Sequence, residues 1–333
     1  MINELYQNDL ESILSCDLPW NNLSGKNILV TGGTGLIGSC IIDVLMKLND
    51  VNVFCMGRSL EKAKNRFKDY FDNPRFNFIC HDITNKLDLD IDFDYIIHAA
   101  SGAHPAEFNN RPVETMTGNF IGTFNLLKYG KVHNMRRFIY ISSGEVYGAA
   151  SSEVDSFSEG YSGYVDCTKV RACYPSSKRA SETLLESFIS EYDINGVIAR
   201  PCHVFGPTMT SEDSRVVAEF IRYAVNGTDI ILRSRGNQMR SYLYVVDAVL
   251  AIFYVLFKGL NKEAYNICGK DRVSIRELAE IIADISNGKV VAENDIDIRE
   301  RAILNCDKLY NLGFRENNSL RGGLEKTIKI LRN

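Results

Sequence analysis

The chain has 333 residues, of which 45% are hydrophobic and 24% are charged, and its formal net charge is −4. These proportions are typical of a folded globular protein and exclude a disordered or collagen-like chain. The acidic balance gives no overall attraction to nucleic acid or to an anionic membrane, and no apolar run reaches the roughly 20 residues that a membrane span needs. One large domain or two modest ones are expected.

The amino-terminal segment and the cysteines indicate the compartment. The first residues carry acidic side chains and lack a basic start followed by an apolar core, so no secretory signal is expected. Nine cysteines show no CxxC spacing, and Cys40, Cys55 and Cys80 lie in apolar segments typical of core residues. We therefore expect no disulfide framework, no metal site and a cytoplasmic location.

From Lys26 onward, short apolar runs alternate with amphipathic helical patterns. Strands are predicted at 27–30, 51–56, 77–80, 95–99, 138–142 and 196–199, and helices at 36–48, 62–70, 120–129 and 181–192. The apolar run 248–257 is too short to span a membrane and is predicted to be a buried helix. Such alternation favours a parallel sheet covered on both faces, which is an α/β doubly wound (Rossmann) fold.

The domain organisation follows from where the alternation weakens, beyond Pro201. Residues 1–24 are expected to form a lead-in with a short helix packed outside the main domain, to which we assign no chemistry. A dinucleotide-binding domain is predicted over 25–200 and 238–262. A smaller α+β substrate domain is predicted over 201–237 and 263–333.

A glycine-rich turn follows the first predicted strand, where residues 31–38 read Thr-Gly-Gly-Thr-Gly-Leu-Ile-Gly. So tight a turn needs glycine's freedom at positive φ, and the helix that it opens offers free N–H groups and a dipole to an anion. The strand before and the helix after give this turn the context of a dinucleotide pyrophosphate site. We expect the cofactor to contact Gly32, Gly35, Leu36, Ile37 and Gly38.

The end of the second strand bears on which dinucleotide is bound. An acidic residue there accepts hydrogen bonds from a ribose 2′-hydroxyl and repels a 2′-phosphate, but this chain has Arg58 nearby instead. A guanidinium suits phosphate, so NADP(H) is favoured and NAD(H) stays an alternative. The other interpretation of Arg58 is a solvated surface residue. Asp82, after the third strand, is a candidate adenine contact or a simple turn residue.

A tyrosine and a lysine four residues apart, Tyr174 and Lys178, lie on one face of a predicted helix. A nearby ammonium favours the phenolate, so Lys178 is expected to lower the pKa of Tyr174 toward neutrality and make the phenol a proton donor or acceptor. Ser143 follows the fifth strand at the carboxyl edge of the sheet, where open α/β folds bind ligands. With the glycine turn, these residues predict an oxidoreductase site.

Together these features resemble the extended short-chain dehydrogenase/reductase family, and specifically its nucleotide-sugar branch. The resemblance covers nearly everything after residue 25. Its motifs are the glycine turn, His98-Ala99-Ala100, Asn119 with Gly122-Thr123, the segment around Ser143, Tyr174 with Lys178, Arg200-Pro201 through Gly206-Pro207, Arg240 through Asp247, and Lys308-Leu309 through Leu312-Gly313-Phe314.

The resemblance implies a role for several of these residues. Ser143 would hydrogen-bond the reacting sugar oxygen, Tyr174 would transfer its proton and Lys178 would hold the nicotinamide ribose. Ala99 and Ala100 would line the cofactor cleft. The implied partners are a nucleoside-diphosphate sugar and a second copy of the chain, because relatives pair through two helices from each subunit.

The resemblance also implies how the substrate is held. Arg240 would bind its diphosphate, because a guanidinium meets phosphate oxygens in bidentate fashion, and Arg301 is a second candidate. The alternative for Arg240 is a salt bridge to Asp247. His203 departs from the family, which has asparagine at that position, so His203 is either a substrate contact or a plain polar lining residue.

The residues before Val-Tyr-Gly bear on the reaction. The base position of a dehydratase is filled by Glu145, whereas the acid position holds Gly144. The segment 170–174 and Glu145 also resemble the decarboxylases of UDP-glucuronate, and Glu145 has a structural hydrogen bond as its alternative. Gly144 and Arg58 favour an NADPH-dependent reductase, because a net reductase must exchange its cofactor with the cellular pool.

The predicted reaction is therefore reduction at C4 of a 4-keto-6-deoxy sugar nucleotide, for example one linked to dTDP, for cell-surface polysaccharide synthesis. The first alternative is a sugar-nucleotide 4,6-dehydratase or a UDP-glucuronate decarboxylase. The next alternative in rank is a 4-epimerase. A non-catalytic NADP-binding regulator is a more remote alternative, because such proteins usually lose the tyrosine or the lysine.

Overall fold

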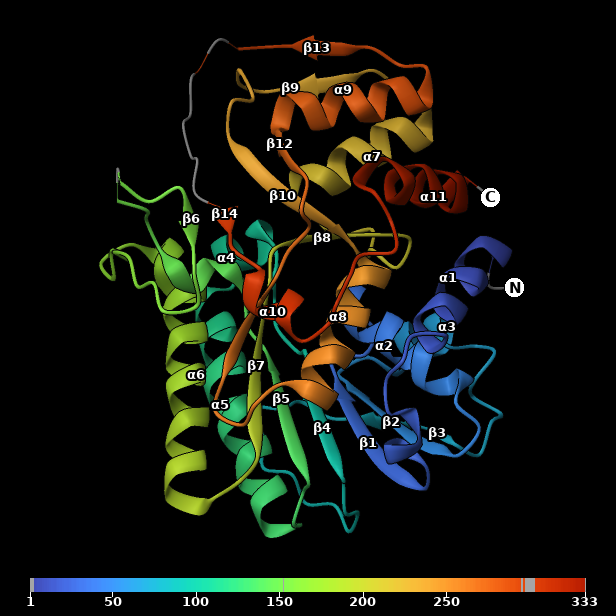
Figure 1. The fold of residues 1–333 in the computed structure, drawn as a ribbon, viewed down its shortest axis with the longest axis vertical. Helices are drawn as coiled ribbons and strands as arrows, with labels where there is room; N and C mark the ends of the chain where they lie inside the picture. Colours follow the sequence, from blue (N-terminus) through green and yellow to red (C-terminus); the bar gives the residue numbers. More distant parts are fainter. Residues whose placement is uncertain (1–2, 152, 295, 297–302, 333) are drawn as a thin grey trace.

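The computed structural model describes residues 3–151, 153–294, 296 and 303–332 (Figure 1). A parallel sheet of seven strands lies at its centre, in the order β11-β7-β5-β4-β1-β2-β3. The strands, in sheet order, are β11 (Ala264–Ile267), β7 (Gly196–Pro201), β5 (Arg137–Ile141), β4 (Tyr95–His98), β1 (Lys26–Thr31), β2 (Val51–Gly57) and β3 (Phe76–Cys80). The predicted α/β doubly wound fold is confirmed.

Helices cover both faces of this sheet because successive strand residues point to opposite sides. In β1, Ile28 and Val30 pack in the cluster that includes α2 (Leu36–Lys47) and α8 (Val245–Lys258), whereas Leu29 packs with α5 (Pro112–Val132) and α6 (Cys173–Tyr192). Figure 1 shows α5 and α6 together on one side of the sheet. Each strand is therefore a continuous apolar run, as the sequence predicted.

The remaining elements surround the sheet and its carboxyl edge. The other helices are α1 (Glu4–Leu14), α3 (Leu60–Arg66), α4 (Pro105–Asn110), α7 (Val216–Asn226), α9 (Ile275–Ser286), α10 (Asp307–Asn311), α11 (Leu320–Arg332) and the 3₁₀ turns η1 (Trp20–Leu23), η2 (Gly144–Tyr147) and η3 (Val170–Ala172). The short strands are β6 (Ser156–Phe157), β8 (His203–Phe205), β9 (Ile230–Leu232), β10 (Met239–Tyr244), β12 (Arg272–Ser274), β13 (Val290–Ala292) and β14 (Ile303–Leu304).

The second half of the chain builds a smaller region above the sheet. There β8, β10 and β12 form a three-stranded sheet, β9 pairs with β13, and α7, α9 and α11 pack beside them (Figure 1). The strand β11 was not predicted, and it joins the central sheet although it lies beyond the segment 238–262 that we expected to return there. The division into two domains stays a prediction.

The helix α1 contacts more of the molecule than expected, since it was predicted to pack only on the outside of the main domain. It contacts α2 and α8 beside the central sheet, and also α11 in the smaller region. The Tyr6 hydroxyl donates to Asp43 of α2 at 2.8 Å, while Asp9 accepts from the Tyr244 hydroxyl at 2.9 Å and pairs with Lys326 of α11. This helix therefore ties the two regions together through buried polar contacts.

The cysteines differ from expectation at two places. Cys268, after β11, and Cys306, before α10, form a disulfide, and neither their spacing nor their surroundings in the sequence signals it. Cys40 and Cys55 are buried as predicted, but Cys80 is exposed because it is the last residue of the edge strand β3. Within the described part of the chain, no helix is long and apolar enough to cross a membrane.

Candidate functional site

A pocket of about 1210 Å³ opens at the carboxyl edge of the central sheet. Its wall contains every site residue that the sequence predicted, except Arg301, which lies outside the described residues. These lining residues are Gly32, Gly35, Leu36, Ile37, Gly38, Arg58, Asp82, Ala99, Ala100, Ser143, Glu145, Tyr174, Lys178, His203 and Arg240. Residues from opposite halves of the chain thus meet in one cavity.

The glycine turn has the shape that a dinucleotide pyrophosphate requires. Gly32 has φ +67°, and a Cβ there would meet the backbone of Ala100 at 2.7 Å. A Cβ on Gly38 would collide with the Gly32 carbonyl, so this glycine lets α2 approach the turn. Gly35 caps α2 with no side-chain hydrogen bond, which leaves the first N–H groups of the helix to an anion. The chain's own residues therefore fit a dinucleotide cofactor.

Beyond β2 and β3 the pocket is lined by Arg58, Asp82 and Lys62. Arg58 is exposed, whereas one carboxylate oxygen of Asp82 accepts hydrogen bonds from the backbone and the hydroxyl of Thr84 at 2.9 and 2.8 Å. Those bonds lower the pKa of Asp82 and make it a turn residue as well as a pocket residue. Lys62, which the sequence analysis did not single out, pairs with Glu212 at 2.9 Å.

The segment after β8 lies across this end of the pocket. The Thr208 hydroxyl donates to the Leu36 carbonyl at 2.8 Å, and the Ser214 hydroxyl accepts from the Ala106 backbone at 3.2 Å. Together with the Lys62–Glu212 pair, these bonds attach residues 208–214 to α2, to α3 and to the start of α4. We call residues 208–214 the crossing segment.

Tyr174, Lys178 and Ser143 come together as predicted, but their electrostatics differ from the prediction. Tyr174 is 4% exposed and Lys178 is 1% exposed, and the Lys178 Nζ lies 5.9 Å from the centre of the Tyr174 ring. Burial raises the pKa of Tyr174 to about 12, against the smaller lowering effect of a hydrogen bond with Ser143. We expected the pKa of Tyr174 to fall toward neutrality, and this expectation is wrong. The loss of solvation of the buried phenol has a larger effect on its pKa than any nearby charge.

Lys178 is held by the sheet rather than by the phenol. Its Nζ donates to the Ile141 carbonyl at 2.8 Å and lies 4.8 Å from the centre of the Tyr140 ring. Burial lowers the pKa of Lys178 to about 7. The lysine is therefore on the edge of losing its charge at neutral pH.

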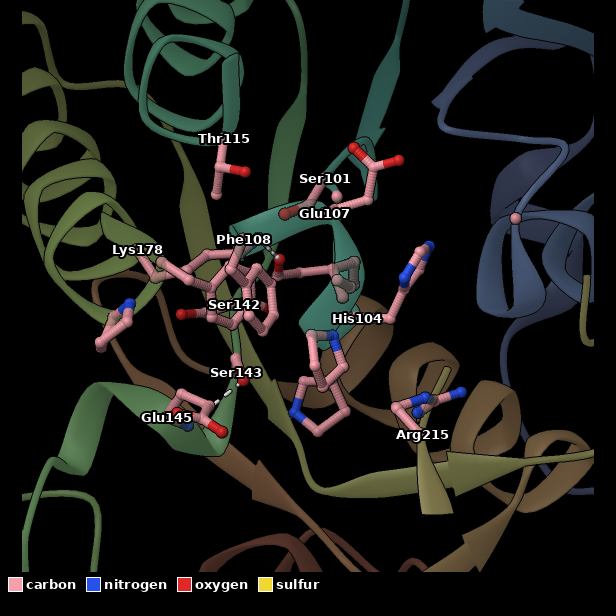
Figure 2. Close-up of a pocket in the computed structure, with 18 of the residues that line it drawn as sticks. Ser101, His104, Glu107, Phe108, Thr115, Ser142, Ser143, Glu145, Lys178 and Arg215 are labelled. Atoms are coloured by element: carbon pink, nitrogen blue, oxygen red, sulfur yellow. Dashed lines mark hydrogen bonds between the residues drawn. The ribbon is translucent and has the colours of Figure 1, made fainter. Parts of the chain in front are cut away.

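Glu145 lies on η2, two residues after Ser143, as Figure 2 shows. The Ser143 hydroxyl accepts from the Glu145 backbone at 3.2 Å, which begins the 3₁₀ turn, and the Glu145 carboxylate pairs with Arg171 at 3.0 Å. Both charged side chains are about half exposed. Arg171 lies in a segment that the sequence analysis quoted, but no role was assigned to it.

His203 and Arg240 stand on neighbouring strands, β8 and β10. Burial, followed by the charges of Arg240 and Arg215, lowers the pKa of His203 to about 3, so the imidazole is neutral at physiological pH. Its Nδ1 is buried and has no hydrogen-bond partner among the residues that the structure describes. Asp247, the alternative partner of Arg240, accepts from the Asn317 backbone at 2.8 Å and from the Asn318 side chain at 3.1 Å.

Two further residues of the pocket were missed from the sequence. Phe108, on α4, stacks on the Tyr174 ring with 4.4 Å between ring centres. Arg215, before α7, is held by Asp213, and its charge lowers the pKa of Tyr174 and of His203. No motif marks either residue, because each reaches the site through a contact between distant parts of the chain.

Comparison with known proteins agrees with this geometry. Residues 28–268 match the NAD dependent epimerase/dehydratase family. UDP-glucuronic acid decarboxylase 6 of Arabidopsis thaliana is 34% identical over 305 residues, which cover 90% of this chain and 87% of the relative. UDP-glucuronic acid decarboxylase 1 of Xenopus tropicalis is 32% identical, over 92% of this chain and 72% of the relative.

Solved structures are similar over the same length. UDP-glucose 4-epimerase from Thermotoga maritima, with UDP-glucose, superposes with a TM-score of 0.79 at 25% identity, over 92% of this chain and 98% of that one. UDP-glucuronic acid 4-epimerase from Bacillus cereus, in complex with NAD, has a TM-score of 0.76 at 25% identity, over 92% and 96%. Fold, glycine turn and sequence agree, and the chain belongs to the NAD dependent epimerase/dehydratase family.

Proposed function

We propose that the protein is an NAD(P)-dependent enzyme that decarboxylates a nucleoside-diphosphate uronic acid, with UDP-glucuronate as the substrate. The named relatives support an enzyme of nucleotide sugars, and they favour this alternative over the reductase that the sequence analysis ranked first. The sugar, its nucleobase and the roles of the site residues are part of the proposal.

One observation carries the choice of reaction. The cavity that contains Ser143, Tyr174 and Lys178 also contains Glu145, which is paired with Arg171. Reduction of a ketone needs a hydride and one proton, which the tyrosine supplies. A second acid–base group beside the first is what a reaction at the neighbouring carbon requires, so the Glu145–Arg171 pair favours chemistry at C5 in addition to C4.

The proposed mechanism assigns one proton to each group. A bound nicotinamide supplies reversible hydride exchange with C4. Tyr174 takes the proton of the C4 hydroxyl, while Ser143 hydrogen-bonds that oxygen. The ammonium group of Lys178 places a positive charge near the phenol. The resulting 4-ketone lies β to the carboxylate, so the C5–C6 bond breaks, CO₂ leaves and the electron pair moves onto the C4 oxygen. The electron pair then returns to C5, which takes up a proton that Glu145 would relay from solvent, and once hydride is back on C4 Tyr174 would return its proton to the C4 oxygen.

The cofactor remains a proposal of its own. The family description and the Bacillus cereus relative name NAD, whereas Arg58 stands near the place where an acidic residue would select NAD. Arg58 supports NADP, as we predicted from the sequence. Separate titrations with NAD and NADP, followed by the protein's fluorescence, test it: tighter binding of NADP is expected, and equal or tighter binding of NAD would remove the role of Arg58.

A homodimer is also proposed, on the basis of α5. This helix exposes apolar side chains at 113, 116, 120, 121 and 124, a spacing that places them on one face. Monomeric soluble proteins rarely expose contiguous apolar patches of this kind. A second copy of the chain, docking the same face, would cover it.

The reaction is tested with purified protein and UDP-glucuronate in the presence of each dinucleotide. We expect one CO₂ and one UDP-pentose for each substrate consumed, with no net change in the absorbance of the reduced nicotinamide. A parallel reaction contains a 4-keto-6-deoxy sugar nucleotide and NADPH. Stoichiometric loss of absorbance there, with no CO₂ from UDP-glucuronate, would establish the reductase instead.

Glu145→Gln tests the assignment of the second proton. The amide keeps the size of the side chain but cannot relay a proton to C5, so steady-state turnover, measured as CO₂ release, should fall by about 10²–10⁴-fold, the usual contribution of a positioned acid or base. Glu153→Gln, a change of an exposed glutamate outside the pocket lining, is the matched control. Loss of less than about threefold in Glu145→Gln would assign Glu145 to structure alone.

A further inference from the structure

The ring of Phe108 contacts two groups of the pocket. It stacks on Tyr174, with ring centres 4.4 Å apart and ring planes inclined by 27°. The guanidinium carbon of Arg171 also lies 4.7 Å from the centre of the Phe108 ring. Arg171 is in turn paired with Glu145. Phenol, phenyl ring, guanidinium and carboxylate thus form one continuous row of contacts.

We propose that Phe108 is a positioning residue that aligns the proton-transfer phenol of Tyr174 and, through Arg171, the carboxylate of Glu145. The inference rests on the proposed function only in giving Tyr174 the proton of the C4 hydroxyl, which every hydride exchange at that carbon requires. It goes further in assigning a role to a side chain that has no acid–base chemistry of its own.

The burial of Phe108 supports a specific contact rather than a chance approach. The side chain is 3% exposed and forms a small cluster with Cys173 and Tyr174, and the Cys173 thiol donates to the Phe108 carbonyl at 3.8 Å. Stacked aromatic pairs and guanidinium–ring contacts each favour one relative orientation of their members. The helix α4 therefore contributes a rigid surface against which Tyr174 and Arg171 are fixed.

Phe108 also keeps water from one face of the phenol. Burial is the dominant cause of the raised pKa of Tyr174, and the Phe108 ring is part of what buries it. The charged groups around the phenol are Glu145 on η2, Arg171 on η3, Lys178 on α6, Arg215 before α7, and Glu107 on α4, which lines the same pocket. None of these is altered when the ring of Phe108 is shortened.

The test compares Phe108→Leu with Phe108→Tyr. Leucine removes the aromatic face, so the limiting rate at high pH should fall about 3- to 10-fold while the KM for the cofactor is unchanged. At the same time, water reaches the phenol and its pKa falls, so the rise of kcat with pH should move to lower pH. Phe108→Tyr keeps the ring and should restore both the rate and the position of this rise.

Two controls keep the test decisive. Phe71→Leu makes the same change in an aromatic cluster beside β3, outside the pocket lining, and should leave kcat and its pH profile unchanged. Thermal unfolding and cofactor titration show whether Phe108→Leu is folded; if it is not, Phe108→Met takes its place. Failure of wild-type protein to release CO₂ refutes the proposed function, and the comparison then uses whichever C4 reaction the wild type catalyses.

Three outcomes would overturn the inference. If Phe108→Leu lowers kcat without moving the pH profile, or if Phe108→Tyr is as slow as Phe108→Leu, the ring only fills space. If Phe108→Leu has the rate and the pH profile of the wild type, Tyr174 is aligned without it.

Discussion

Lys178 illustrates how a single side chain exchanges stability for function. Its pKa is lowered from 10.5 to about 7 by burial, so between these pH values the unfolded chain binds more protons than the folded chain. The folded protein is therefore destabilised most below pH 7, where Lys178 is charged in the pocket, and this cost disappears as the pH rises toward 10.5. Groups of this kind are found where activity, rather than stability, selects the residue.

Lys178→Met should raise the melting temperature of the protein and abolish turnover. At pH values below 7, the melting temperature should rise by several degrees, and the rise should shrink at higher pH. The reason is that methionine never bears the charge that burial penalises. Differential scanning calorimetry over a series of pH values measures this change in melting temperature. The control is Lys64→Met, a change of an exposed lysine on α3, which should show no such dependence on pH. A lower melting temperature at every pH would contradict it.

At this scale the sequence was informative where the chemistry is local. Tyr174 and Lys178 share one helix, so their spacing predicted that they lie on one face, and Ser143 and Glu145 follow one strand at the edge of the sheet where ligands bind. The pKa of Tyr174 was wrong because it depends on how much solvent the fold excludes, which no spacing states. Phe108 could not be predicted, because its role comes from a contact with a helix far along the chain.

Among the elements, the short helix α1 contacts both regions of the molecule. Its Asp9 is 4% exposed and joins the Tyr244 hydroxyl and the Lys326 ammonium, from β10 and α11. Removing the buried carboxylate takes away the acceptor of the Tyr244 hydroxyl and the ion-pair partner of Lys326, which keeps its hydrogen bond to Asn318. Asp9→Ala should therefore lower the free energy of unfolding by about 2–4 kcal/mol, measured by urea denaturation.

The same helix provides the control. Glu11 pairs with Lys47, but its side chain is 65% exposed, so Glu11→Ala should change the free energy of unfolding by less than about 1 kcal/mol. Equal effects of the two changes would mean that α1 contributes through helix propensity rather than through Asp9. A short helix was predicted here, packed outside the main domain, but not that it joins both regions, because each of its partners is far away in the sequence.

The strands of the first half were predicted closely, because a parallel sheet leaves a continuous apolar run in the sequence. Its helices were placed less well, since α4 was not predicted and α5 begins at Pro112 and not at residue 120. β11 was missed because the alternation of strands and helices weakens beyond Pro201, and the α+β pattern predicted there did not place the small sheets of β8, β10 and β12 and of β9 and β13.

For the whole molecule, the exposed face of α5 predicts how two copies associate. Replacing Phe120 and Phe124 together by aspartate places charge on a face that a partner would desolvate, so the protein should sediment as a monomer. Leu260→Asp, a change of an isolated exposed leucine, should leave the dimer intact. A wild-type protein that sediments as a monomer, or a double variant that remains dimeric, would show that α5 is not the interface.

The crossing segment has a consequence for the order of events in a catalytic cycle. Its bonds attach it to α2, to α3 and to the start of α4, and it follows β8, whose His203 lines the same pocket as the glycine turn. We expect a dinucleotide bound at the glycine turn to leave only after these bonds break. Slow departure of the coenzyme would suit the proposed reaction, in which the same coenzyme molecule is regenerated in every turnover.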